Sequence, residues 1–373
     1  MSRRSARAQF QTQHGLRLVV IVIAAALLGG CYFTRAAYEE GRILWSRKPI
    51  EDALARGDLP ADVHEKLETV LAVRKFAEEQ LGLNVGGAYE TYANVDKGAI
   101  VHVVMAAPRD SLKPYTWWFP IVGHVPYRGY FEESNANAEA AKLEARGLDT
   151  LVRPSVAFSS LGFFRDPFLT NLLTLDRVEL AGVLIHELFH RTYYLPSDAM
   201  FDESAANYVG SAGAVAFFAA TDGPSAPSTI AARGILDSDM KFSRFLLKEQ
   251  ARLLDIYMAD LPTAELEKRR EAAFAAIKAD YAALEPSLSG LERFDLDKQP
   301  LNNAVLVNYL IYFHDLDNFA ALDRMNHGDL RATIAQIISI AKEHPEDPFY
   351  AISQVVNSAA STRDSSASSP PKK

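Results

Sequence analysis

Cysteine is almost absent from this sequence, which has only Cys31 among its 373 residues. A single cysteine excludes an intramolecular disulfide. Positive charge is also scarce, because 39 Lys and Arg stand against 47 Asp and Glu, which gives a net charge of −8 and a pI near 5.7. This balance argues against nucleic acid as a partner. Hydrophobic residues make up 49% of the chain, which is enough for the core of one large domain or two ordinary ones.

An apolar run near the N-terminus, Leu18–Leu28, is too short to span a membrane but suits a signal peptide. Several arginines precede it, and Leu28-Gly29-Gly30 lead directly into Cys31. These small residues resemble a bacterial lipobox, in which the cysteine is lipidated and becomes the mature N-terminus. We therefore predict a lipoprotein signal peptide over residues 1–30. An uncleaved anchor helix and a buried thiol are the alternatives.

Lipidation of Cys31 would tether the protein to the membrane of a bacterial cell envelope, facing the periplasm. The residue after the cysteine is Tyr32. An Asp at that position would resemble a signal for retention in the inner membrane. The sequence therefore favours the outer membrane.

The pattern H-E-x-x-H is formed by His186, Glu187 and His190. No Pro or Gly interrupts the chain from Val183 to Leu195, and Asp176 can cap a helix that contains the motif. Residues four apart share one face of a helix, so the two imidazoles can bind one metal ion, for which zinc is well suited. Glu187 can reach a water on that ion as a general base. The alternative is a chance match on a structural helix.

A third protein ligand is needed, and Glu203 is the best candidate. It lies at the start of a second predicted helix, capped by Asp202 or Ser197. Ala206 and Gly210 lie on its own face, and small residues there would let this helix press against the first. Asn207, one turn after Glu203, is a candidate to hydrogen-bond a ligand histidine.

Elsewhere the apolar pattern is mostly helical, and the fold class that we predict is α+β, dominated by helices. β-branched and aromatic residues concentrate between Tyr89 and Phe158, which predicts one small β-sheet there. Two helical stretches, Asp239–Leu261 and the segment from Thr263, flank a Leu-Pro turn and predict an antiparallel helical hairpin. The catalytic domain would cover 31–355. The Ser- and Pro-rich segment 356–373 is predicted to be disordered.

Several stretches together resemble a bacterial family of aminopeptidases that are predicted zinc metallopeptidases and often lipoproteins. The stretches are KPIEDAL, VRKFAEEQLGLN, WWFPIVGHVPYRGYF, FSSLGFFRDPFL, LIHELFHRTYY, FDESAANYVG and PLNNAVL. The resemblance implies a zincin-like fold and a gluzincin-like site, with His186, His190 and Glu203 on zinc and Glu187 as base. The chain departs from the family pattern at Asp202, where Asn is usual, and at His124, where Cys is common.

The leading hypothesis from the sequence is zinc-dependent peptide hydrolysis by an aminopeptidase, with a peptide as substrate. A second donor would hold the oxyanion beside zinc. The candidates are Tyr127, Tyr130, Tyr194, Tyr312 and His314. An aminopeptidase also needs a carboxylate for the substrate's α-amine. The candidates are Glu132, Glu133 and Asp166.

Three alternatives remain open at the level of the sequence. An endopeptidase of envelope proteins needs no carboxylate for an amine. A lipid-anchored binding or scaffold protein would carry a structural metal site, although such a site has no need of Glu187. An enzyme that matures or degrades envelope proteins in a complex would use the helical hairpin as a docking surface.

Overall fold

The computed structural model describes residues 41–95, 101–119, 122–155, 166–290, 294, 296 and 298–367. The predicted signal peptide and Cys31 lie outside these residues, as does the segment 156–165. Within the described part, no helix combines the length and the apolar character that crossing a membrane requires. The elements, in chain order, are β1 (Lys48–Pro49), α3 (Ile50–Arg56), α4 (Ala61–Glu79), β2 (Thr91–Ala93), β3 (Val101–Pro108), β4 (Trp117–Phe119), β5 (Gly123–Val125), β6 (Tyr127–Tyr130), α5 (Glu133–Glu144), β7 (Leu148–Ser155), β8 (Phe168–Leu169), η1 (Thr170–Thr174), α6 (Arg177–Thr192), α7 (Ala199–Thr221), α8 (Pro227–Tyr257), α9 (Thr263–Leu284), η2 (Glu285–Ser287), α10 (Asn303–Phe313), α11 (Leu316–Met325), α12 (Leu330–Glu343) and α13 (Pro348–Ala367).

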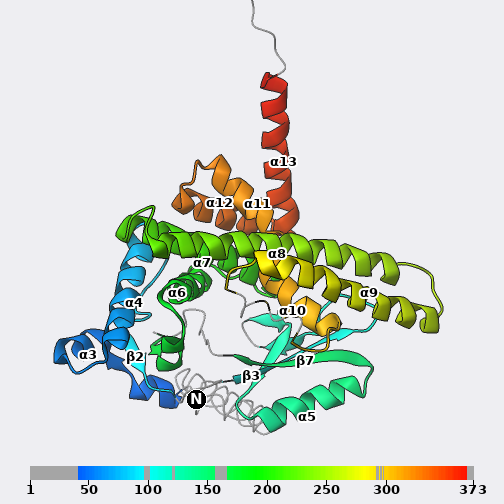
Figure 1. The fold of residues 1–373 in the computed structure, drawn as a ribbon, viewed down its shortest axis with the longest axis horizontal. Helices are drawn as coiled ribbons and strands as arrows, with labels where there is room; N and C mark the ends of the chain where they lie inside the picture. Colours follow the sequence, from blue (N-terminus) through cyan, green and yellow to red (C-terminus); the bar gives the residue numbers. More distant parts are fainter. Residues whose placement is uncertain are drawn as a thin grey trace, which may run out of the picture.

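Helix α7 is the centre of the helical part. It is buried along most of its length and packs against α6, α8 and α10. In Figure 1, α8 runs across the molecule beside α7, and α6 lies beneath α7. A helix that is apolar all round must be covered on every side. This explains why the chain wraps other helices around α7.

The main sheet has the strand order β6-β3-β7, and both pairs are antiparallel. Successive residues of a strand point to opposite faces. On β3, Val104 and Ala106 pack against α5 in a small apolar cluster, whereas Val103 and Met105 belong to the large core. The sheet is therefore covered by α5 on one face, and its other face is shared by α10 and the cleft described below.

The prediction of one small sheet was wrong, because the described residues form three. A second three-stranded sheet has the order β1-β2-β8, and β4 pairs with β5 in a two-stranded ribbon. Strands β1 and β8 have two residues each and lie outside the window 89–158. Segments this short carry no alternating pattern, so tertiary contacts alone decide that they pair. The coarser prediction of an α+β fold dominated by helices is confirmed.

The predicted helical hairpin is present as α8 and α9. Phe242 and Phe245 of α8 pack against Tyr281 near the end of α9, and Lys248 pairs with Asp280. Since only residues 258–262 connect the two helices, they run antiparallel. The first helix begins at Pro227, well before the expected start at Asp239, because Pro at the first position favours a helix start.

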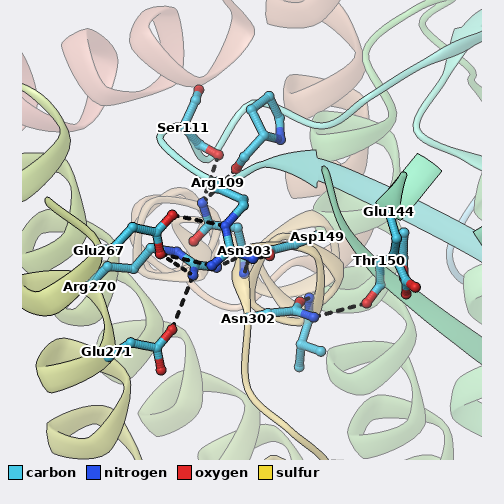
Figure 2. A network of polar contacts seen from close by, with 12 residues as sticks. Arg109, Ser111, Glu144, Asp149, Thr150, Glu267, Arg270, Glu271, Asn302 and Asn303 are labelled. Carbon is cyan, nitrogen blue, oxygen red and sulfur yellow. Dashed lines mark hydrogen bonds and ion pairs between the residues drawn. The ribbon is translucent and has the colours of Figure 1, made fainter. Parts of the chain in front are cut away.

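An ion-pair network centred on the buried Arg270 and Asp149 fixes this hairpin to the main sheet (Figure 2). Arg270 of α9 bonds the carboxylate of Asp149 on β7, and the same carboxylate accepts from the backbone N–H of Asn303 at 2.9 Å. Arg109 joins Asp149 at 3.6 Å and Glu267 at 2.8 Å. The network thus links strand β7, helix α9 and the start of α10.

The C-terminal helix α13 extends to Ala367 and projects from the body of the molecule (Figure 1). The segment predicted to be disordered began at residue 356, so helix and predicted tail overlap. No Pro or Gly occurs between Phe349 and Ser369 to end a helix, although the apolar period fades. The absence of an apolar face does not by itself end a helix, which is why the predicted boundary differs from the structure.

Candidate metal centre and cleft

Helix α6 carries the H-E-x-x-H motif, and its start is fixed by local chemistry. The side chain of Asp176 accepts from the backbone N–H groups of Val178 and Glu179, and Glu179 returns a bond to the backbone of Asp176, which completes a capping box. The predicted cap at Asp176 is therefore confirmed. The helix ends before Tyr193, ahead of Pro196.

Helix α7 begins at Ala199, and its cap is Asp198, whose side chain accepts from the backbone N–H of Phe201. The predicted cap, Asp202 or Ser197, was wrong. Asp202 lies inside the first turn, where its carboxylate instead accepts from the backbone N–H of Leu195 at 2.8 Å. An N-cap residue must precede the first helical turn, and the sequence offers several acceptor residues close together at this point.

The small residues of α7 do allow a close helix crossing. A Cβ at Gly210 would lie 2.7 Å from the carbonyl oxygen of Gly182 on α6 and 3.1 Å from the Cβ of His186. The two backbones therefore touch at this pair. Glu203 lies two turns before Gly210 on α7, and the crossing brings its carboxylate to the face of α6 that carries the histidines.

His186, His190 and Glu203 offer ligand atoms that all lie within 4.8 Å of one another. The Nε2 atom of His186 is 3.2 Å from Oε2 of Glu203, the Nε2 atom of His190 is 3.3 Å from the same oxygen, and the two Nε2 atoms are 3.0 Å apart. Two imidazoles and a carboxylate that converge in this way offer three donors that could hold one metal ion. The residues present thus fit a metal ion.

The electrostatics of the three groups favour a bound cation. Burial lowers the pKa of His190, but the nearby carboxylates, led by Glu203, together have the larger, opposite effect. The net result is a pKa raised to about 9. Burial raises the pKa of Glu203, but the two histidines lower it well below its usual range. Without a metal, the positive charge of the protonated His190 imidazole thus keeps the Glu203 carboxylate ionised. A divalent cation would take the place of that charge.

These ligands lie at the wall of a cleft of about 770 Å³ between α6, α7, α10 and the main sheet. Glu187 also lines the cleft, beside His186. Its carboxylate follows the first ligand directly, which is the position from which a base can reach a metal-bound water. The cleft is large enough for a short peptide.

Three of the predicted oxyanion candidates reach the cleft and two do not. Tyr127, Tyr194 and Tyr312 line it. Tyr130 lies on the opposite face of β6, where it packs with the cluster under α5. His314 packs edge-on against Phe349 at 4.8 Å between ring centroids, away from the described lining of the cleft. Period-two alternation along β6 explains why Tyr127 and Tyr130 differ.

Tyr127 and Tyr312 touch the metal centre in different ways. The hydroxyl of Tyr127 donates to Oε1 of Glu203 at 3.4 Å. The ring of Tyr312 stacks on His186 at a centroid distance of 6.4 Å. Burial and the charge of Glu203 raise the pKa of both phenols, so both remain protonated donors at neutral pH. The hydroxyl of Tyr194 is farther away and donates to the backbone carbonyl of Val122 at 3.3 Å.

The predicted amine-binding residues Glu132, Glu133 and Asp166 are not among the described residues that line the cleft. Glu132 and Glu133 mark the start of α5 on the far face of the sheet. The carboxylates in the lining are Glu179, Glu187, Asp202 and Glu203. Asn207, predicted to support a ligand, does line the cleft one turn after Glu203.

Sequence reasoning missed Arg153 on β7 and Asn308 on α10, which both line the cleft. The one available signal was a charged residue among the apolar residues near the end of the window 89–158, where a sheet was predicted. A lone arginine in such a strand is more often placed at the surface, so the signal did not identify a site.

A family model described as "Putative aminopeptidase" matches residues 31–349 of the chain. No curated protein and no solved structure matches the chain. The family match covers the three candidate metal ligands, Glu187 and the cleft-lining strands.

Proposed function

This chain belongs to the putative aminopeptidase family, and we propose that it is a zinc-dependent metallopeptidase that removes N-terminal residues from peptides in the bacterial envelope. The single observation that carries the zinc assignment is the convergence of His186, His190 and Glu203 within 4.8 Å, at the wall of a cleft that Glu187 also lines. A zincin-like arrangement is supported by the motif helix facing an antiparallel sheet across that cleft.

Each residue of the centre has a chemical task in this proposal. His186, His190 and Glu203 would hold the metal, which when bound would polarise the attacking water and the scissile carbonyl. Glu187 takes a proton from the water and delivers it to the leaving amine. Tyr127 orients the Glu203 carboxylate through its hydroxyl. Tyr312, a partly buried phenol stacked on His186, is the donor best placed to stabilise the developing oxyanion.

The decisive experiment compares the purified mature domain with its Glu187→Gln variant. We expect about one zinc per chain in both, because the amide fills the same volume and is not a ligand. The parent should release N-terminal residues from a peptide library. The variant should lose at least a hundredfold in kcat, since general base catalysis contributes about 10²–10⁴-fold.

Four outcomes would overturn parts of this proposal. Absence of zinc from the parent would remove the metal assignment. Cleavage by the variant at the parent rate would show that Glu187 is not the base. Internal cleavage without release of N-terminal residues would favour an endopeptidase, and bound zinc without any hydrolysis would favour a structural metal site.

We also propose that Cys31 is lipidated and anchors the enzyme in the envelope, facing the periplasm and in the outer membrane. The support is the basic start, the short apolar run and the small residues before the cysteine. Cys31→Ser should prevent processing at that position and leave the full precursor held by its apolar segment. Processing of the variant at the same position, with unchanged membrane association, would contradict the lipoprotein assignment.

A further inference from the structure

Arg153 places a positive charge in the cleft. Among the described residues that line the cleft it is the one lysine or arginine, and it comes from β7, an edge strand of the main sheet. Val103 on β3 is paired with both Gly129 and Arg153, so these three residues lie in one row across the sheet. All three line the cleft. The strand register thus fixes Arg153 on the substrate side of the sheet.

Two side chains of α10 hold the guanidinium in place. Its Nε donates to Oδ1 of Asn308 at 2.8 Å, and its Nη2 donates to the hydroxyl of Tyr312 at 3.2 Å. Asn308 and Tyr312 are one helical turn apart, so they present their polar atoms side by side. The guanidinium also lies 5.8 Å from the centroid of the Tyr312 ring. Arg153 is therefore positioned rather than free to swing.

Neither partner neutralises the charge. Asn308 is a neutral amide, and the Tyr312 hydroxyl accepts the bond from Nη2 as a neutral phenol. Within the described part of the chain, no carboxylate pairs with Arg153. Structural arginines of this protein do have such partners, as Arg270 has Asp149 and Arg177 has Asp222. A partly buried cation without a counter-charge is costly unless an anion arrives from outside.

The geometry leaves room for such an anion. The contacts to Asn308 and Tyr312 use one proton on Nε and one on Nη2. The end of the guanidinium formed by Nη1 and Nη2 keeps donors for a carboxylate, which arginine binds with two parallel hydrogen bonds. The Tyr312 ring lies close to both groups, because its centroid is 5.8 Å from Cζ of Arg153 and 6.4 Å from the centroid of the His186 ring. An extended chain rises about 3.4 Å per residue, so the anion lies within about four residues of the scissile bond.

The carboxylates of the cleft have other tasks. Glu187 and Glu203 belong to the metal centre, Glu179 completes the capping box of α6, and Asp202 is buried against the backbone of Leu195. We propose that Arg153 binds a carboxylate of the peptide, so that the preferred substrates are short peptides with a negative charge a few residues beyond the scissile bond. This inference rests on the proposed peptidase function. The carboxylate is either the free C-terminus or an acidic side chain.

The test uses the zinc-loaded enzyme and matched short peptides. One pair differs only in a free or amidated C-terminus, and a second, amidated pair differs only in Glu or Gln after the scissile bond. The parent should have a lower KM for the charged member of at least one pair, by about ten- to a hundredfold. The first pair reports a C-terminal carboxylate, and the second reports an acidic side chain.

Arg153→Gln should abolish this preference by raising KM for the charged peptide toward that of its neutral partner. Arg153→Lys should retain part of it. Arg128→Gln is the matched control, because Arg128 lies on the opposite face of the same sheet, paired with Val104, and the preference should remain. Circular dichroism and zinc content establish that each variant is folded and loaded.

Two results would overturn the inference while the peptidase function stands. One is a parent enzyme without preference in either pair. The other is an Arg153→Gln variant that loses kcat equally on charged and neutral peptides at unchanged KM, which would make Arg153 a stabiliser of the oxyanion. Failure of the parent to cleave any peptide would instead count against the proposed function. Calorimetric binding of the same peptides to zinc-loaded Glu187→Gln, with and without Arg153→Gln, would then decide the inference by itself.

Discussion

Gly210 of α7 lies against Gly182 of α6 so closely that a Cβ at residue 210 would be 2.7 Å from the carbonyl oxygen of Gly182. There is more space on the α6 side of this contact. A Cβ at Gly182 would be 3.8 Å from the carbonyl oxygen of Gly210, which is an ordinary van der Waals distance. The crossing that delivers Glu203 to His186 and His190 thus depends on the absence of a side chain on one helix in particular. This asymmetry leads to the first prediction.

Gly210→Ala should force α7 away from α6, destabilise the protein by about 1–3 kcal/mol and weaken zinc binding, because overpacked cores respond with backbone shifts. Gly182→Ala, the matched control, should change both properties far less. Thermal unfolding and competition for zinc with a chelator measure the two effects. Equal responses of the two variants would show that the Gly210 backbone does not set the position of Glu203.

Tyr127→Phe should weaken zinc binding by about tenfold, since residues that orient a ligand typically contribute 10–100-fold to metal affinity. The reason is the hydrogen bond at 3.4 Å from the Tyr127 hydroxyl to Oε1 of Glu203. Tyr194→Phe is the control, because its hydroxyl donates to the carbonyl of Val122 instead. Chelator competition at neutral pH should separate the two variants. Identical zinc affinities would mean that the hydroxyl of Tyr127 does not support the ligand.

Asp202→Asn should flatten the pH dependence of stability in the metal-free protein. Burial raises the pKa of Asp202 to about 8, against the opposing effects of the Leu195 N–H and His190. A raised pKa means that the folded state binds the proton more tightly than the unfolded state. The stability from Asp202 is therefore complete below about pH 4 and is lost as the pH rises through about 8.

The asparagine can still accept from the Leu195 N–H and carries no charge, so the variant should be more stable than the parent at pH 8 and similar at pH 4. Urea unfolding across this range measures the difference. Asp222→Asn should behave in the opposite way. The pKa of Asp222 is raised by burial but lowered overall by hydrogen bonds from Ser228 and Arg177, so its contribution is present at neutral pH and lost in acid. A parent and an Asp202→Asn variant with parallel pH profiles would refute the assignment.

Arg270→Met should destabilise the protein by about 3–5 kcal/mol, because it leaves the buried carboxylate of Asp149 without its main partner. Arg109 is half exposed and 3.6 Å from Asp149, too weak a replacement. Arg269→Met is the control on the same helix, since its pair with Glu265 is exposed and screened by solvent and should contribute little to stability. Denaturant unfolding distinguishes them. A small effect at Arg270 would mean that the network in Figure 2 does not hold α9 to the sheet.

The convergence of residues at the candidate metal centre could be predicted from the sequence because its geometry is local. His186 and His190 share a helix face by their spacing alone, and Asp176 and Glu179 fix the start of that helix through bonds over three residues. Glu203 follows on the next helix, with Gly210 as a visible sign of a close crossing. Periodicity and capping act over one or two helical turns, and such distances are readable from the order of the residues.

The rest of the cleft was decided by tertiary structure. Arg153 and Tyr312 meet at 3.2 Å although 159 residues separate them in the chain. Strand register and helix packing decided which of Tyr127, Tyr130 and His314 would face the cleft. The two-residue strands β1 and β8 pair only because the fold brings them to β2. In the long helices, a residue's own sequence neighbourhood specifies its secondary structure and which face it occupies. What lies opposite that face is set by packing between distant segments, for which the local pattern holds no signal.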